Sequence, residues 1–306
     1  MHLNLRCSLL AVAVPLIVAT AANAQPAQPP EPTIEFRFGT GATHQFDTDI
    51  DDGGEFSVTR AHGGISATYE FNPDLKLDAA FGYEFSSYDF SGTAGFGMLD
   101  PWEDIHSIRF SARFTYRLDE QWSLFGGPVF TLSAEDGADL GDGFAPGGLV
   151  GATYRFSDEL TLGGGLLVVG EIEDDVVVFP TIVVNWKIND EWTLRNSRAD
   201  FGPGSLGGGL EAAWAFAADF EVAFGVGYQW RQFKLDDSGV APDGVGIELS
   251  VPVYADLTWN INPTASLNLM AAVAVTGELE LQSSSGATIS EQDYDPAALF
   301  GARLTI

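Results

Sequence analysis

The stretch SIRFSARFTYRL, Ser107–Leu118, alternates strictly between two kinds of side chain. Its even-numbered positions are all apolar or aromatic, whereas its odd-numbered positions are polar and include Arg109, Arg113 and Arg117. Because successive side chains of a β-strand point to opposite faces, this alternation predicts one strand with an apolar face and a basic face. Such a strand is longer than the roughly five or six residues usual in globular proteins. About ten residues are what a tilted strand needs to cross a bilayer.

A short polar phrase recurs between stretches of this kind and predicts tight turns between antiparallel strands. Its copies are NPDLKL at Asn72, DEQWSL at Asp119, SDELTL at Ser157, NDEWTL at Asn189 and NPTASL at Asn262, with a weaker copy, AADFEV, at Ala217. The opposite ends of the same strands run into longer acidic loops. Short turns at one end and long loops at the other are typical of membrane β-barrels.

Counting between the turns predicts an all-β, transmembrane, antiparallel up-and-down β-barrel of about fourteen strands. Glycine and proline between Asp200 and Ser205 obscure the pattern, so twelve strands is the alternative. The fourteen strands are expected near 33–46, 56–72, 75–90, 105–118, 121–134, 146–156, 159–172, 176–188, 191–198, 206–217, 219–235, 244–260, 264–282 and 297–306.

The beginning of the chain has the composition of a secretory signal peptide. An apolar run ends in the small-residue motif Ala22–Ala24, which predicts cleavage after residue 24. We therefore expect a signal peptide over 1–24, a Pro/Gln-rich leader over 25–32 and one barrel domain over 33–306. The single cysteine, Cys7, precedes the cleavage motif, so the mature protein would have no disulfide and no thiol chemistry.

The chain is strongly acidic, with a formal net charge of -29, which argues against a nucleic-acid partner. Most of the acids lie in the predicted long loops, where they would form an anionic rim able to attract divalent cations. Asp47, Asp49 and Asp51 alternate as in a calcium-binding loop, but Asp52 stands where an EF-hand needs glycine. They are a weak metal-site candidate, and the sequence predicts no other metal site and no cofactor.

Aromatic residues gather near the predicted turns on the apolar faces of the strands. Trp122, Trp186, Trp192 and Trp259 have the placement of the aromatic belt that meets lipid headgroups. The alternative, a soluble β-sandwich with an aromatic core, agrees poorly with strands whose second face is charged.

On these grounds the chain resembles the bacterial outer-membrane β-barrel proteins, porin-like barrels in particular, across the region after residue 32. The resemblance implies a location in the bacterial outer membrane, contact with outer-membrane lipid and insertion by the barrel-assembly machinery. Such barrels usually end on an aromatic residue, whereas this chain ends on Ile306. The resemblance implies no particular substrate.

The polar faces of the strands predict a charged lumen with two unlike walls. The basic wall would consist of Arg37, Arg60, Arg109, Arg113, Arg117, Arg155 and Arg303. The acidic wall would consist of Glu211, Glu221, Glu248, Asp256, Glu278 and Glu280. These charges could line a water-filled pore, or they could pair and plug the barrel.

We therefore expect a porin-like channel for passive diffusion of small polar solutes. The alternatives are a closed structural or surface-binding barrel with cation-binding acidic loops and, with less support, a barrel hydrolase. His44, His62 and His106 are the histidines available for a hydrolase, and none lies in a recognisable nucleophile motif. The sequence thus favours a protein that is not an enzyme.

Overall fold

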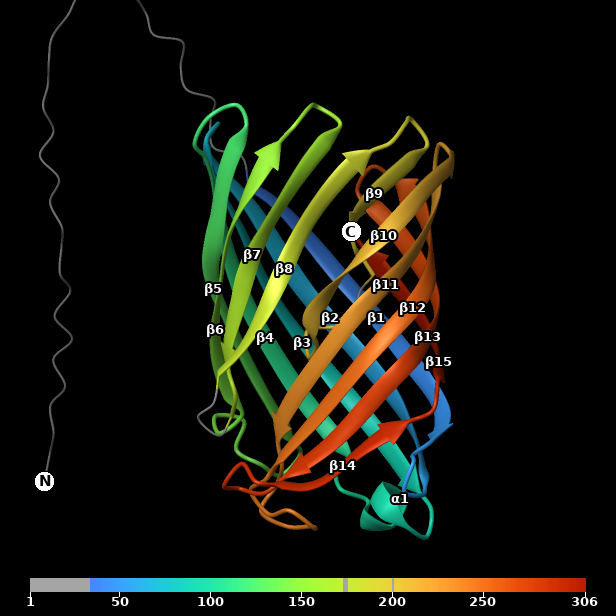
Figure 1. The fold of residues 1–306 in the computed structure, drawn as a ribbon. Helices are drawn as coiled ribbons and strands as arrows, with labels where there is room; N and C mark the ends of the chain where they lie inside the picture. The colour runs from blue at the N-terminus through green and yellow to red at the C-terminus, as the bar shows by residue number, and fades with distance from the viewer. Residues whose placement is uncertain (1–33, 173–175, 200) are drawn as a thin grey trace, which may run out of the picture. The chain divides into compact units, whose positions relative to one another are not determined.

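The computed structural model describes residues 34–172, 176–199 and 201–306. The predicted signal peptide and leader lie outside these residues. The described chain forms a barrel of antiparallel strands in which each strand of the barrel pairs with the next barrel strand along the chain (Figure 1). β1 also pairs with β15, which closes the ring.

The strands agree with the sequence-based ranges to within three residues at every end. Those of the first half are β1 (Ile34–Asp49), β2 (Glu55–Asn72), β3 (Leu75–Ser91), β4 (Asp104–Arg117), β5 (Trp122–Glu135), β6 (Phe144–Arg155) and β7 (Leu160–Gly170). Those of the second half are β8 (Val176–Lys187), β9 (Trp192–Asn196), β10 (Leu206–Ala217), β11 (Phe220–Lys234), β12 (Val245–Asn262), β13 (Ala265–Gln282) and β15 (Ala297–Thr305). Fourteen strands are therefore confirmed, and the twelve-strand alternative is wrong.

Two elements were not expected from the sequence. A short helix, α1 (Gly95–Leu99), lies in the loop between β3 and β4. A short strand, β14 (Thr288–Tyr294), pairs with the end of β13 that β15 leaves unpaired. In the described part of the chain, no helix is long and apolar enough to span a membrane.

The repeated polar phrase forms tight turns through its first side chain. Asn189 Oδ1 accepts hydrogen bonds from the N–H groups of Glu191 (2.9 Å) and Trp192 (2.8 Å). The first residue of each other full copy accepts the N–H of the residue two positions later, at Asn72, Asp119, Ser157 and Asn262. This is the local bonding that makes Asn, Asp and Ser turn residues.

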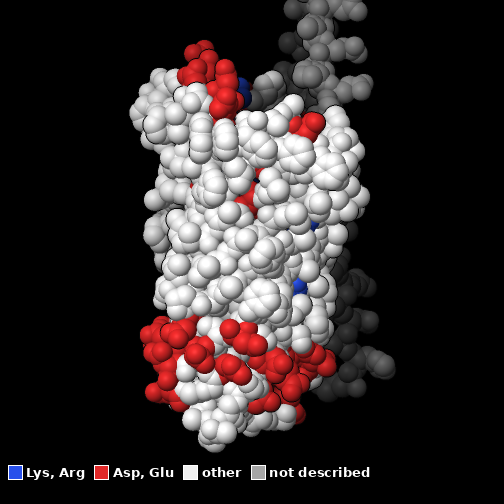
Figure 2. Space-filling view, turned by 90° about the vertical axis from the view of Figure 1, so that its right-hand side faces the viewer, with Lys and Arg blue, Asp and Glu red and all other residues white. Residues whose placement is uncertain are grey.

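The outer surface carries an apolar band between two polar ends. Figure 2 shows the acids gathered at the end with the long loops, below a broad surface with few charges. At the other end the aromatic residues near the turns face outward, with Trp122, Trp186 and Trp259 each more than two-fifths exposed. We call the two ends of the barrel the loop end and the turn end.

The interior of the loop-end half is filled by buried aromatic and aliphatic side chains. This inner cluster includes Phe56, Tyr88, Phe90, Phe96, Trp102, Phe233, Leu279, Leu281 and Tyr294. Trp102 stands edge-on to both Phe90 and Phe233, with ring centroids 5.4 and 5.2 Å apart. Because such packing leaves little space between side chains, the loop-end half is a solid core rather than a passage.

A second apolar cluster lies on the outer face of β11 and β12 near the loop end. Trp230 and Ile247 are buried there together with Leu167 of β7, and Phe179 of β8 packs against Trp230 with ring centroids 5.6 Å apart. Lys234 of β11 also pairs with a residue of β5, although these strands are not neighbours in the wall. The wall formed by β6, β7 and β8 therefore overlaps the outside of β11 and β12 at this end.

Candidate functional site

The interior of the turn-end half is open and charged. A cavity of about 670 Å³ is lined by residues of β1–β8 and β10, and one of about 1020 Å³ is lined by residues of β1, β9–β13 and β15. Both cavities are lined by Glu35 and Arg37 of β1. We call this combined space the vestibule.

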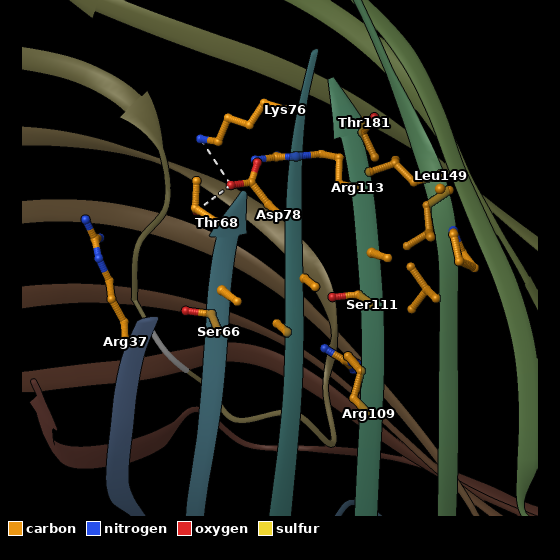
Figure 3. Close-up of a pocket in the computed structure, with 18 of the residues that line it drawn as sticks. Arg37, Ser66, Thr68, Lys76, Asp78, Arg109, Ser111, Arg113, Leu149 and Thr181 are labelled. Atoms are coloured by element: carbon orange, nitrogen blue, oxygen red, sulfur yellow. Dashed lines mark hydrogen bonds and ion pairs between the residues drawn. The ribbon is translucent and has the colours of Figure 1, made fainter. Parts of the chain in front are cut away.

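One side of the vestibule is lined by the polar face of β2, β3 and β4 (Figure 3). Arg109 and Arg113 come from β4, the strand with the predicted basic face. The carboxylate of Asp78 accepts hydrogen bonds from Thr68 (2.8 Å) and Arg113 (3.1 Å), and it pairs with Lys76 at 3.1 Å. The Arg113 side chain is still about half exposed. This wall is therefore charged and accessible.

The facing side of the vestibule holds a compact ionic cluster on β9, β10 and β11. Arg195 pairs with Glu211 through Nε (2.7 Å) and with Glu221 through both terminal nitrogens (3.1 and 2.5 Å). Tyr254 donates a hydrogen bond to Glu211 at 2.9 Å. Bidentate arginine–carboxylate pairs of this kind are geometrically specific. The acidic wall thus carries its own arginine.

Between the vestibule and the inner cluster lies a buried polar layer. Arg60 of β2 reaches across the interior to Glu248 of β12 at 2.6 Å, and Tyr88 donates to the same carboxylate at 2.5 Å. Both charged side chains are less than 5% exposed. Arg231 pairs with Glu84 at 3.5 Å in the same layer. At this depth the two walls neutralise each other across the barrel.

The segment that connects β9 to β10 folds into the barrel and roofs the vestibule. We call residues 197–199 and 201–205 the inner segment. Arg231 donates a hydrogen bond to the carbonyl of Phe201, and the Ser197 hydroxyl donates to the Tyr254 hydroxyl oxygen at 2.5 Å. Gly202 has a positive φ of 85°, and a Cβ there would lie 1.6 Å from Glu84 Oε2. Only glycine permits this close approach.

Eleven of the thirteen predicted lumen residues fall into three groups. Arg37, Arg109, Arg113, Arg303, Glu211, Glu221 and Asp256 line the vestibule. Arg60 and Glu248 form the buried cross-barrel pair instead of lining open space. Arg117 and Arg155 are exposed at the turn-end tips of β4 and β6.

Glu278 and Glu280 do not occupy the predicted inner face, and this expectation was wrong. The pairing of β12 with β13 shifts register between Ser250 and Pro252, because β13 carries an extra residue there. Such a bulge reverses which side chains point inward. Leu279 and Leu281 are fully buried in the inner cluster as a result, and the two glutamates lie on the opposite face.

Three functional arginines were missed, although strand alternation could have found two of them. Arg195 lies on the face opposite Trp192 and Leu194 of its strand, and Arg231 shares the face of Glu221. Arg198 follows the end of β9 and belongs to the inner segment, for which alternation gives no information. Its N–H donates to Glu211 at 3.0 Å.

The histidines do not assemble a hydrolytic site around the vestibule. His44 contacts Thr59 at 2.9 Å and His106 contacts Tyr83 at 2.7 Å, and both contacts lie on the outer face of the barrel. His62 alone points inward, between the vestibule and the inner segment. Within the described residues, Asp47, Asp49 and Asp51 form no group that could hold a metal ion.

Comparison with known proteins bears on the fold. A family model described as the outer membrane protein beta-barrel domain matches residues 11–179. No curated protein sequence matches the chain. Similar solved structures include an outer membrane channel from Pseudomonas putida F1, with 10% identity, a TM-score of 0.49 and coverage of 93% of this chain and 100% of that one. The P. putida toluene transporter TodX has 10% identity, a TM-score of 0.41 and coverage of 88% and 89%.

Proposed function

Because the chain belongs to the outer membrane β-barrel family, we propose that it is a gated outer-membrane channel for small polar solutes and not an enzyme. The observation that carries this proposal is the vestibule, an open interior space with unlike charges on facing walls. Arg109 and Arg113 stand on one wall, and Glu211 and Glu221 stand on the other. Facing charges across a water-filled space select solutes by charge and dipole.

Passage through such a channel requires a conformational change. The inner segment and the buried layer of Arg60 and Glu248 separate the vestibule from the loop end. The inner segment is the natural moving part, because it is not paired as a strand and is attached to the walls by single hydrogen bonds, among them those with Arg231, Tyr254 and Glu211. We therefore expect a small or intermittent conductance in the resting protein.

Planar bilayers test this proposal. Refolded protein should give conductance steps, and the double substitution Arg109→Ser with Arg113→Ser should reduce the anion-to-cation permeability ratio several-fold, measured as a shift of the reversal potential in a salt gradient. Arg117→Ser is the matched control, because that arginine is exposed at the strand tip. Absence of conductance steps from correctly folded protein would refute the channel.

The filled loop-end half supports a second candidate, a closed barrel that binds partners or divalent cations through its acidic loops. Its distinguishing observation is the cluster of acids at the loop end, on the face shown in Figure 2. Calcium titration of the intact barrel checks this candidate. Replacing Asp136, Asp139 and Asp142 with asparagine should weaken binding, and unchanged binding would exclude this loop as the site.

A further inference from the structure

The barrel wall has a seam at β9. This strand has five residues, whereas its neighbours β8 and β10 have twelve each. Within the described residues, β9 pairs with β8 only at Asn185–Lys187 and with β10 only at Leu210–Trp214. Toward the loop end the chain leaves the wall as the inner segment. The edges of β8 and β10 beyond β9 are therefore not joined by a strand.

A cavity of about 600 Å³ occupies this seam. It is lined on β8 by four consecutive residues, 179–182, and on β10 by four consecutive residues, 207–210. Consecutive residues of a strand point to opposite faces of the wall. On β8 the lining includes an inward residue, Thr181, and an outward one, Ile182, whereas on β10 three of the four residues are glycines whose backbone borders the cavity. The cavity thus lies in the wall between the two strands and reaches both faces of β8, and we call it the side port.

The side port has an apolar frame. Phe179 packs against Tyr228 of β11 with ring centroids 6.0 Å apart, which closes the port toward the loop end. Ile182 lies on the outer apolar band and is 64% exposed. Its neighbours along the same face of β8, such as Val178, are also exposed. Leu167 and Leu210 complete the apolar lining. The apolar part of a molecule dissolved in the bilayer would therefore contact apolar side chains at the port.

The turn-end border of the port is held by hydrogen bonds. Asn196 donates to the carbonyl of Ile182 at 2.7 Å and accepts the N–H of Val184 at 3.0 Å. Its amide side chain thus replaces the strand that β8 lacks beyond this point. In hydrocarbon, an unpaired strand edge is costly unless it is satisfied or lines a cavity. The port is therefore part of the built wall and not a frayed end.

The inner end of the port adjoins the vestibule. Leu167, Thr181 and Gly207 line both the side port and the 670 Å³ cavity that contains Arg109 and Arg113. The lining is thus apolar where the port crosses the barrel wall and charged where the port meets the vestibule. A ligand that suits both parts has an apolar body and a polar end.

We propose that the side port binds small amphipathic molecules from the bilayer and delivers their polar ends to the vestibule. The delivery step rests on the proposed channel function, whereas binding at the port does not. The inner cluster blocks the straight path to the loop end, so the seam is the opening between vestibule and surroundings that faces the membrane.

Gly208 gives a precise way to fill the port. A Cβ at this position would have no other atom within 4 Å, so a large side chain enters open space. By contrast, a Cβ at Gly207 would lie 1.8 Å from the carbonyl oxygen of Tyr228. Gly208→Trp should therefore occupy the port without disturbing the wall. Val150→Trp, at a 61% exposed outward position of β6, is the matched control.

Binding of the amphipathic fluorescent probe 11-(dansylamino)undecanoate to the barrel in lipid nanodiscs, corrected for empty nanodiscs, tests the proposal. Gly208→Trp should weaken binding at least tenfold, and Val150→Trp should leave it unchanged. Laurate should displace the probe from the wild-type protein. Equal probe affinity in Gly208→Trp and wild type would overturn the proposal.

A cysteine variant keeps the test decisive if the tryptophan variant does not fold. In a Cys7→Ser background, Gly208→Cys is the single thiol of the chain. Laurate should slow its reaction with N-ethylmaleimide several-fold, and an unchanged rate would overturn the proposal. Conductance separates the two proposals: a barrel that binds the probe at Gly208 but never conducts refutes the channel and retains the port.

Discussion

The two halves of the barrel share one wall but have opposite interiors. In the turn-end half, inward positions carry charged side chains around open space. In the loop-end half, inward positions of the same strands carry Phe56, Tyr88 and Phe233, and the space is filled. The alternation of a strand therefore fixes which residues point inward, whereas the size and polarity of those residues decide whether the lumen is open.

The largest difference in stability should appear when one partner of an ion pair is removed from the buried layer or from the vestibule. Arg60→Ala leaves Glu248 buried without its guanidinium, so we expect a loss of about 3–5 kcal/mol in the free energy of unfolding. Arg113→Ala at the exposed pair with Asp78 should cost about 0–1 kcal/mol. Urea unfolding in detergent micelles measures both.

Replacing both members of the buried pair sharpens the same comparison. The double variant Arg60→Met with Glu248→Leu should recover most of the stability lost by Arg60→Ala, because it leaves no uncompensated charge. If the single substitution costs no more than Arg113→Ala, the loop-end half is hydrated and is not the solid core described above.

The bulge in β13 predicts a smaller but still clear contrast. Leu279→Ala should cost about 2–5 kcal/mol, because the side chain is fully buried in the inner cluster. Glu278→Ala, one residue earlier, should change stability by less than about 0.5 kcal/mol, as expected for a surface position. The same urea titration applies, and reversed magnitudes would place the glutamate in the lumen.

The turns should contribute less to the free energy of unfolding than the buried ion pair or the inner cluster. Asn189→Ala removes the acceptor for the N–H groups of Glu191 and Trp192, so we expect a loss of about 0.5–1.5 kcal/mol. Asn189→Asp keeps the acceptor and is the matched control. Equal losses in the two variants would show that these hydrogen bonds do not stabilise the turn.

The smallest expected effect is a pH dependence at the turn end. The N–H groups of Trp122 and Gln121 lower the pKa of the Asp119 carboxyl in the folded protein. Its stabilising contribution is therefore present above the unfolded pKa and is lost as the pH falls through the folded pKa. The stability difference between wild type and Asp119→Asn should shrink on acidification, and a difference that stays constant would contradict this assignment.

Local features of the fold were predictable from the sequence, and contacts across the barrel were not. The strand ends follow from alternation and from turn residues such as Asn72 and Asn262, which act within a few positions of the chain. The pair of Arg60 with Glu248 joins residues 188 positions apart, and no local pattern encodes it.

The weakest part of the sequence pattern marks the most unusual part of the structure. Glycine and proline between Asp200 and Ser205 obscured the strand alternation, and the chain leaves the wall here as the inner segment, next to the side port. A bulge such as the one beside Gly277 left no comparable signal, so the faces of Glu278 and Glu280 were misassigned.

The pairing of β1 with β15 has a consequence for how the protein is made. Gly39 is paired with Thr305, and Phe38 and Ile306 exchange backbone hydrogen bonds of 2.7 and 2.9 Å, so the ring closes only when β15 reaches β1. Contacts of such large sequence separation form slowly. Until closure, the two edge strands expose unpaired N–H and C=O groups that can join another chain. The free edge of β1 must therefore be protected from self-association until β15 has paired with it.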